Sequence, residues 1–268
     1  MLIIRQAQLD VLAELRMREF EDRALAHLQR WMPRHCRLLG PAPMRLLVRR
    51  GLAQARRYGL QAECTVLGYL DLMCLLGSGF DADPLLPWAA AILGEPHRTD
   101  PVPRGDRLHE AAWHYIERIV PDYRDDRGAP VTERLVRLLR ELRALPRDAL
   151  PEAEVPAFAD SLLGLLATYF PAKLAVVGPG PAAAALREGC RRARGHGLVG
   201  RRGAALVALL AFVLGHGFDD DPLLPWVPPI LHADADEAAR VDRLFATGAE
   251  TLRRWWDQAA PPAASALH

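Results

Sequence analysis

A ten-residue segment occurs twice in the chain and constrains the fold more than any other feature. GFDADPLLPW spans residues 79–88, and GFDDDPLLPW spans residues 217–226, which lie 138 positions later. The same offset, without a gap, pairs GPAP at 40–43 with GPGP at 178–181. Roughly a third of the positions in 20–93 match their partners, more than two unrelated helical stretches would give. The sequence therefore predicts an internal duplication.

Each copy has the pattern of a series of helices, with proline and glycine at matching places. Apolar residues recur at helical spacing over 8–32, and Pro33 ends that helix. A second helix begins at the prolines of GPAP and stops at Gly59. Further helices are predicted over 62–76, 83–93, 107–119, 154–170, 179–196, 199–215, 222–231 and 235–257. Sustained alternation of a strand type is nearly absent, so we predict an all-α fold of two tandem copies.

The predicted domain boundaries follow from the duplication. The first copy covers 1–125 and the second covers 134–258. Between them the polar, turn-rich sequence VPDYRDDRGAP favours a linker at 126–133. The small and proline-rich residues 259–268 are expected to form a flexible tail.

The overall charge disfavours a nucleic acid or an anionic membrane as the partner. Lysine and arginine number 34 against 33 acidic residues, a formal charge of +1. The longest uncharged apolar stretch, 203–218, is shorter than the roughly 20 residues that a bilayer span needs, so a buried helix is expected there. The N-terminus has no signal-peptide pattern, and the four cysteines show no disulfide framework. We therefore expect a cytoplasmic protein.

The aspartates of the two decapeptides allow two interpretations. Asp81 and Asp83, with Asp219, Asp220 and Asp221 in the second copy, could hold Mg²⁺ or Mn²⁺ as paired carboxylates do. In the structural interpretation, Asp83 is the N-cap of the next helix, Pro84 lies in its first turn, and the apolar residues bury the corner. The structural interpretation explains more of the motif, and no metal or cofactor is predicted.

Two arginines on the second helix of each copy share one helix face. Arg49 and Arg56 are seven residues apart, and Arg187 and Arg194 repeat them at the same offset. They could bond Asp81, Asp219 or nearby carbonyl groups within each copy, or offer guanidinium groups to an acidic partner. The first interpretation is preferred.

Three segments of the first copy carry a family resemblance. They are RxFEDRxLAHLxRxxPxxCxxLG over 18–40, RRGLAQARRYGL over 49–60, and YLDLMCLLGSGFDADPLLPWAAAIL over 69–93. Together they resemble short helical proteins encoded beside bacterial type VI secretion genes, whose products include spike proteins and PAAR-tipped toxins. The resemblance implies a process rather than a reaction. Asp71 of the first copy is Leu209 in the second, so only the first copy retains a site that uses Asp71.

These observations favour a non-enzymatic protein-binding accessory, acting as chaperone, adaptor or immunity protein for a secreted toxin or spike component. The sequence shows no nucleophile, base and orienting group at a recognisable spacing. The candidate binding residues are Asp71, Asp81, Asp83, Trp88, Arg49, Arg56, Asp219, Asp221, Trp226, Arg187 and Arg194. Four tryptophans, Trp31, Trp113, Trp255 and Trp256, are further candidate anchors, because aromatic side chains dominate interface energetics.

Two other functions stay open at this point. A divalent-metal-dependent enzyme would use the duplicated aspartate loops. Nucleic-acid binding would use RRGLAQARR and REGCRRAR, but the near-neutral charge and the sparse aromatic residues argue against it.

Overall fold

Helices build both halves of the chain in the computed structural model, which describes residues 6–95, 103–123 and 132–257. The first half, residues 6–123, contains α1 (Gln6–Trp31), α2 (Pro33–Leu39), α3 (Pro41–Arg57), α4 (Glu63–Leu76), the 3₁₀ turn η1 (Phe80–Ala82), α5 (Pro87–Gly94), α6 (Arg104–Ile119) and η2 (Val120–Tyr123). The second half, residues 132–257, contains α7 (Thr132–Ala144), η3 (Glu152–Glu154), α8 (Val155–Tyr169), α9 (Pro171–Val177), α10 (Pro179–Gly195), α11 (Arg201–Leu214), η4 (Phe218–Asp220), α12 (Val227–Leu231) and α13 (Glu237–Asp257). Within these ranges the one β-type pairing is an isolated bridge between Ala149 and Gly200. The all-α prediction is confirmed.

Several elements of the two halves begin and end 138 residues apart. This holds at both ends for α2 and α9, α3 and α10, α4 and α11, and η1 and η4. The chain leaves α4 and α11 at Gly77 and Gly215, whose φ angles are +95° and +105°. Only glycine adopts such angles readily, because a Cβ would clash with the backbone. Local sequence thus sets the same chain reversal in each half.

Glycine also lets helices cross closely at one matching place in each half. A Cβ on Gly189 of α10 would lie 2.5 Å from the Cα of Ala208 in α11. A Cβ on Gly51 of α3 would lie 2.4 Å from a side-chain methyl of Leu70 in α4. The absence of a side chain therefore fixes how near these two pairs of helices approach.

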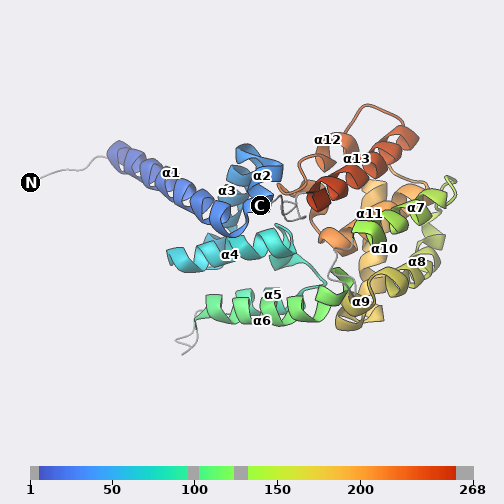
Figure 1. The fold of residues 1–268 in the computed structure, drawn as a ribbon, viewed down its shortest axis with the longest axis horizontal. Coiled ribbons are helices and arrows are strands. Elements are labelled where there is room, and N and C mark those ends of the chain that lie inside the picture. The colour runs from blue at the N-terminus through green and yellow to red at the C-terminus, as the bar shows by residue number, and fades with distance from the viewer. Residues whose placement is uncertain (1–5, 96–102, 124–131, 258–268) are drawn as a thin grey trace, which may run out of the picture.

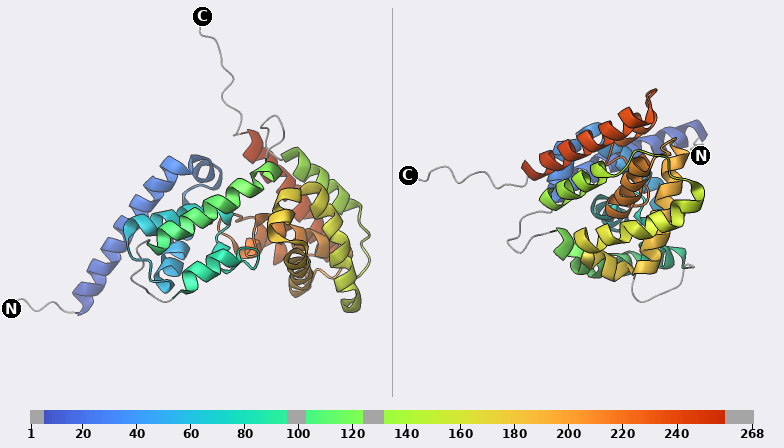
Figure 2. Two further views of the ribbon diagram at one scale, coloured as in Figure 1. Left: turned by 90° about the horizontal axis from the view of Figure 1, so that it is seen from below. Right: turned by 90° about the vertical axis from the view of Figure 1, so that its right-hand side faces the viewer.

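Each half has its own hydrophobic core, and the halves lie side by side (Figures 1 and 2). Tyr69 and Phe80 are among the largest fully buried side chains of the first half, and Phe170, Phe212 and Phe218 among those of the second. Burying one such ring contributes about 1.5–3 kcal/mol before the entropic cost of ordering it. The N-terminal turns of α1 extend beyond the other helices of the first half (Figures 1 and 2).

The structure differs from the sequence prediction in several helices. α5 begins at Pro87 rather than at Asp83, and α12 begins at Val227 rather than at position 222. The helices α2, α7 and α9 were not predicted. Of the predicted linker 126–133, residues 126–131 lie outside the described residues, and the last two belong to α7. The predicted tail 259–268 also lies outside them. The apolar stretch 203–218 forms most of the buried α11, and no helix in the described part of the chain has the length and apolar character to cross a bilayer.

Candidate functional site

The two decapeptides face each other where the halves meet, and their second aspartates bond across the junction. Asp83 accepts the backbone N–H of Leu85 at 2.8 Å with one oxygen and that of His216, in the second half, at 3.0 Å with the other. Asp221 does the same with Leu223 at 2.8 Å and with Ser78, in the first half, at 2.7 Å. The bonds are reciprocal, since each residue lies 138 positions from its counterpart. The N-cap prediction for Asp83 is wrong: the carboxylate organises a turn and ties it to the other half.

The leucine after each of these aspartates is also exchanged. Leu85 is buried in the core of the second half, and Leu223 packs against the core of the first. Gly79 and Gly217 meet between the exchanged segments, where a Cβ on either would lie 3.8 to 3.9 Å from the Cα of the other. The decapeptide is therefore a reciprocal interlock of the two halves.

Burial shapes the electrostatics of the interlock. Asp221 is 3% exposed, and its pKa is raised because burial disfavours the charged carboxylate more than the two backbone N–H bonds favour it. Arg50 of α3 reaches over the junction to the neighbouring Asp220, with its guanidinium 3.0 Å from the carboxylate. Asp220 is largely exposed, so this second contact contributes little to stability.

The first aspartate of each decapeptide is held inside its own half. The Tyr58 hydroxyl donates to Asp81 at 2.9 Å, and burial beside this carboxylate raises the pKa of Tyr58 to about 12. In the second half, His196 occupies the position of Tyr58 and lies 2.8 Å from Asp219, which Arg192 also contacts at 3.2 Å. The carboxylates are therefore part of the internal structure of each half.

Arg49 of α3 and the arginines Arg187 and Arg194 of α10 bond within their own halves, but their partners are other than Asp81 and Asp219. Arg49 pairs with Glu21 of α1 at 2.8 Å, and Arg187 with Asp160 of α8 at 3.3 Å. Arg194 donates to the carbonyl of Leu150 at 2.7 Å, and Arg56 is exposed. Arg49 thus ties α3 to α1, and Arg187 ties α10 to α8.

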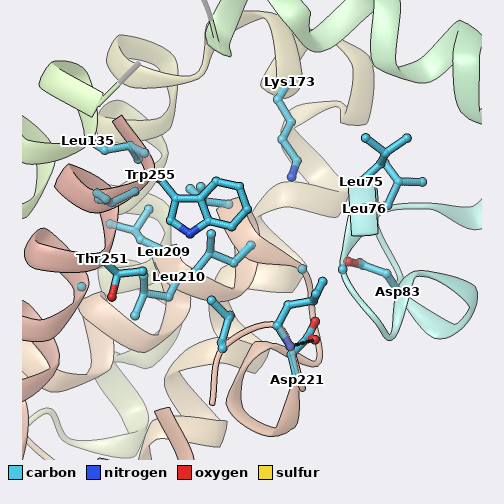
Figure 3. A pocket seen from close by; sticks show the side chains of 18 of the residues that line it. Leu75, Leu76, Asp83, Leu135, Lys173, Leu209, Leu210, Asp221, Thr251 and Trp255 are labelled. Carbon is cyan, nitrogen blue, oxygen red and sulfur yellow. Dashed lines mark hydrogen bonds between the residues drawn. The ribbon is translucent and has the colours of Figure 1, made fainter. Parts of the chain in front are cut away.

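A mostly apolar cavity of about 440 Å³ lies between the halves, next to the interlock. Its volume falls within the range of small-molecule pockets. Helices of both halves line it with aliphatic side chains, which include Leu75, Leu76, Ile116, Ile119, Leu135, Leu138, Leu139, Leu142, Leu209, Leu210, Val213 and Leu252. Figure 3 shows Trp255 and Lys173 reaching toward it and Asp83 and Asp221 at the side where the two decapeptides meet. The cavity can bind an apolar group and offers few polar contacts at fixed places.

Two titratable side chains at this cavity, Lys173 and His35, are largely buried. Lys173, the single lysine of the sequence, is 7% exposed; its ammonium donates to the Phe212 carbonyl at 2.6 Å and lies 5.0 Å from the centre of the Phe212 ring. His35 stacks edge-on against Trp255 at 4.6 Å, and burial lowers its pKa to about 4. The imidazole is therefore neutral at physiological pH and adds to the apolar lining.

Beyond the cavity mouth, a face of α1 and α4 carries the last predicted site residue. Asp71 pairs with His27 at 2.9 Å. Leu75, one turn further along α4, is 48% exposed, and Trp31, one turn beyond His27, is 61% exposed. We call Trp31, His27, Gly68, Asp71 and Leu75 the α1–α4 face. Exposed apolar side chains therefore lie on this face beside one hydrogen-bonded histidine–aspartate pair.

The other predicted aromatic anchors are divided between surface and interior. Trp113 of α6 is 57% exposed. Trp88 is partly buried against the first core, near Tyr115, and Trp226 packs against the second core and lines the cavity. The side chain of Trp256 lies outside those described.

The described side chains form no metal-ligand cluster, and burial favours the protonated form of two cysteine thiols. In the ranges that the structure covers, no group of three or more histidine, cysteine, aspartate or glutamate side chains is placed to hold a metal ion. Burial raises the pKa of the Cys74 thiol, and raises that of Cys190 to about 11, which disfavours the reactive thiolates.

Comparisons with protein families, with curated proteins and with solved structures each gave no match.

Sequence reasoning missed the cavity and much of its lining. The leucines of α7 at 135, 138, 139 and 142 have the i, i+3, i+4, i+7 spacing of an amphipathic helix, which would have predicted this helix. For Lys173, its being the only lysine was the sole signal. The exchange of Leu85 and Leu223 left no signal beyond the repetition of the motif.

Proposed function

We propose that this chain is a non-enzymatic protein-binding accessory of a type VI secretion system, acting in the cytoplasm as a chaperone, adaptor or immunity protein for a secreted toxin or spike component. In this proposal the gene arose by duplication of a helical unit, as the shared helix bounds of the two halves support. The partner inserts an apolar segment into the cavity between the halves. The leucine-rich lining of that cavity is the observation that carries the proposal.

The contacts of the decapeptide aspartates also favour binding over metal chemistry. Both oxygens of Asp83 and both of Asp221 accept backbone N–H groups. A carboxylate in that position stabilises the junction, and binding a cation there would compete with those bonds. The alternative of a divalent-metal-dependent enzyme would require the interlock to open.

Affinity purification tests the proposal directly. The tagged protein is expressed together with the neighbouring toxin and spike genes, and retained proteins are identified by mass spectrometry. We expect one toxin or spike subunit at near-stoichiometric amount. Failure to retain any of them, in cells where their expression is verified, would refute the type VI assignment.

A matched pair of leucine variants locates the binding site. Leu75→Asp places a charge at the cavity mouth, whereas Leu46→Asp places it on α3, where Leu46 is 56% exposed and does not line the cavity. Both positions are exposed, so both variants should fold. We expect capture to be lost with Leu75→Asp and kept with Leu46→Asp; equal capture by the two variants would remove the cavity from the proposal.

A further inference from the structure

The two halves differ in what covers their equivalent faces. In the second half α7 packs against α8, α11 and α13. Glu141 of α7 accepts the Tyr169 hydroxyl, and Arg202 of α11 donates to the carbonyl of Leu145, just beyond the end of α7, at 2.7 Å. Among the described residues of the first half, α3 packs on both α1 and α4 as α10 packs on both α8 and α11, but no further helix takes there the place that α7 has in the second half.

The residues at the equivalent positions of the first half are smaller, more polar or more exposed. Leu206 and Leu209 of α11 are 1% and 2% exposed, and their counterparts are Gly68 and Asp71. A Cβ on Gly68 would meet nothing within 4 Å, so α4 is hollowed at that point. The buried Tyr169 corresponds to the exposed Trp31. The α1–α4 face therefore has the shape of a helix-binding surface without the helix.

We propose that the α1–α4 face binds an amphipathic helix of a partner protein, in the position that α7 takes on α8 and α11. This inference rests on the proposed function and specifies the kind of segment that is bound. The expected helix has apolar residues spaced as in α7 and a basic residue opposite Asp71, where the second half has a leucine. Leu75 belongs both to this face and to the cavity lining, so one end of the helix reaches the cavity mouth.

Aspartate at position 71, where the second half has a leucine, fits a partner helix that binds reversibly. α7 belongs to the same chain and covers the leucines of α11 permanently. A surface that binds a separate partner must also be stable in water when the partner is absent. The Asp71 and His27 pair keeps the uncovered face compatible with water, and the exposed Trp31 and Leu75 supply apolar contact area. Such a mixture is typical of non-obligate interfaces.

The exposed Cys64 can report which end of a bound helix lies near it. Cys64 occupies the position of Arg202, which bonds the carbonyl just past the C-terminal end of α7. A helix bound as α7 is bound would therefore end near Cys64. Among the other cysteines, Cys74 and Cys190 are buried and Cys36 is partly buried.

Disulfide exchange with two synthetic peptides tests the proposal on the purified full chain. Both peptides have the sequence of residues 132–145, and each carries one cysteine, at either its N-terminal or its C-terminal end, activated as a disulfide with an aromatic thiol. The Cys64 thiolate attacks the peptide sulfur, a new disulfide forms, and the aromatic thiol leaves with the electron pair of the broken bond. Release of the aromatic thiol gives the rate, and mass spectrometry identifies the modified cysteine.

We expect the C-terminal cysteine peptide to modify Cys64 at least about tenfold faster than the N-terminal one, because binding raises the local concentration of the correctly placed sulfur. Gly68→Leu fills the hollow and should abolish this difference. Gly164→Leu, on an exposed part of α8 where a Cβ also meets nothing within 4 Å, should preserve it. Equal rates for the two peptides, or an unchanged difference in Gly68→Leu, would overturn the proposal.

Sedimentation of the protein without peptide tests whether a second copy of this chain occupies the α1–α4 face. A dimer that Gly68→Leu dissociates would show that a second copy of this chain covers the face, which also contradicts binding of a partner helix. None of these measurements contains a toxin or spike protein. A positive peptide result with an empty affinity purification would therefore reject the type VI assignment and retain the helix-binding face.

Discussion

Ser78 donates its backbone N–H to the carboxylate of Asp221 at 2.7 Å, so a side chain of the second half completes a loop of the first. We expect Asp221→Asn to lower the free energy of unfolding by about 1–3 kcal/mol, because an amide has one acceptor oxygen for two buried N–H groups. Urea unfolding followed by circular dichroism measures the loss. Asp220→Asn, at an exposed neighbouring position, should cost less than about 1 kcal/mol. Equal losses would show that the bonds across the junction add no stability.

The exchanged leucine predicts a second dependence of stability on the junction. Leu85→Ala leaves a space in the core of the half to which Leu85 does not belong in sequence, and should cost about 2–5 kcal/mol. Leu223→Ala should cost less, since Leu223 is only partly buried. Leu46→Ala, on the exposed face of α3, serves as the control and should stay within about 0.5 kcal/mol of the parent protein. Denaturant midpoints for the three variants rank these effects.

His35 predicts a specific pH dependence of stability. Its pKa is lowered by burial from 6.5 to about 4 in the folded protein, so between these values the unfolded chain binds a proton that the folded chain does not. This contribution to stability is complete above pH 6.5 and is lost as the pH falls toward 4, with a slope of at most about 1.4 kcal/mol per pH unit. Comparing unfolding of the parent and His35→Gln across this range isolates it. His114→Gln, at an exposed position of α6, is the control for replacing a histidine outside the cavity.

Two helix glycines should respond to alanine with opposite signs. Gly68→Ala adds a methyl group to open space within α4 and should stabilise the protein by about 0.5–1 kcal/mol. Gly189→Ala would place the methyl group 2.5 Å from the Cα of Ala208, so α10 and α11 must separate and stability must fall. Thermal unfolding of the two variants side by side would contradict the described helix crossing if both shifted upward.

Chemical labelling of Lys173 can test whether its ammonium is buried at the cavity. Because it is the only lysine and is 7% exposed, an amine-reactive acetylating reagent should modify it far more slowly in the folded protein than in urea. Mass spectrometry of the peptide that contains Lys173 measures the rate apart from the N-terminal amine. Equal rates in native buffer and in urea would mean that the ammonium is open to solvent.

The helices that sequence predicted best are those with local punctuation. The proline pairs before α3 and α10 and the glycines Gly59 and Gly197 after them are readable from the chain, and both helices end within a residue of the predicted positions. Local signals also misled in one place. Asp83 followed by Pro84 has the pattern of a helix start, but its carboxylate bonds Leu85 and a residue 133 positions away, and the helix begins at Pro87 instead.

The candidate site depended on contacts that no local pattern contains. Asp71, Trp31 and Trp113 could be proposed from sequence as surface residues, whereas the cavity requires helices from both halves to meet. The repeat alone shows that Asp71 stands where the second half has Leu209. That this position lies on a face covered by α7 in the second half can be learned only from the structure.

The reciprocal bonds of Asp83 and Asp221 impose a condition on any chain that contains just one decapeptide. Its aspartate would have a turn to organise but no second loop to receive the other oxygen, and its leucine would have no foreign core to enter. Two identical chains related by a two-fold axis would meet both needs, since such an interface is self-complementary. A one-motif chain of this type is therefore expected to be a homodimer, and a tandem fusion of two such chains would be a single molecule in which each half can change independently.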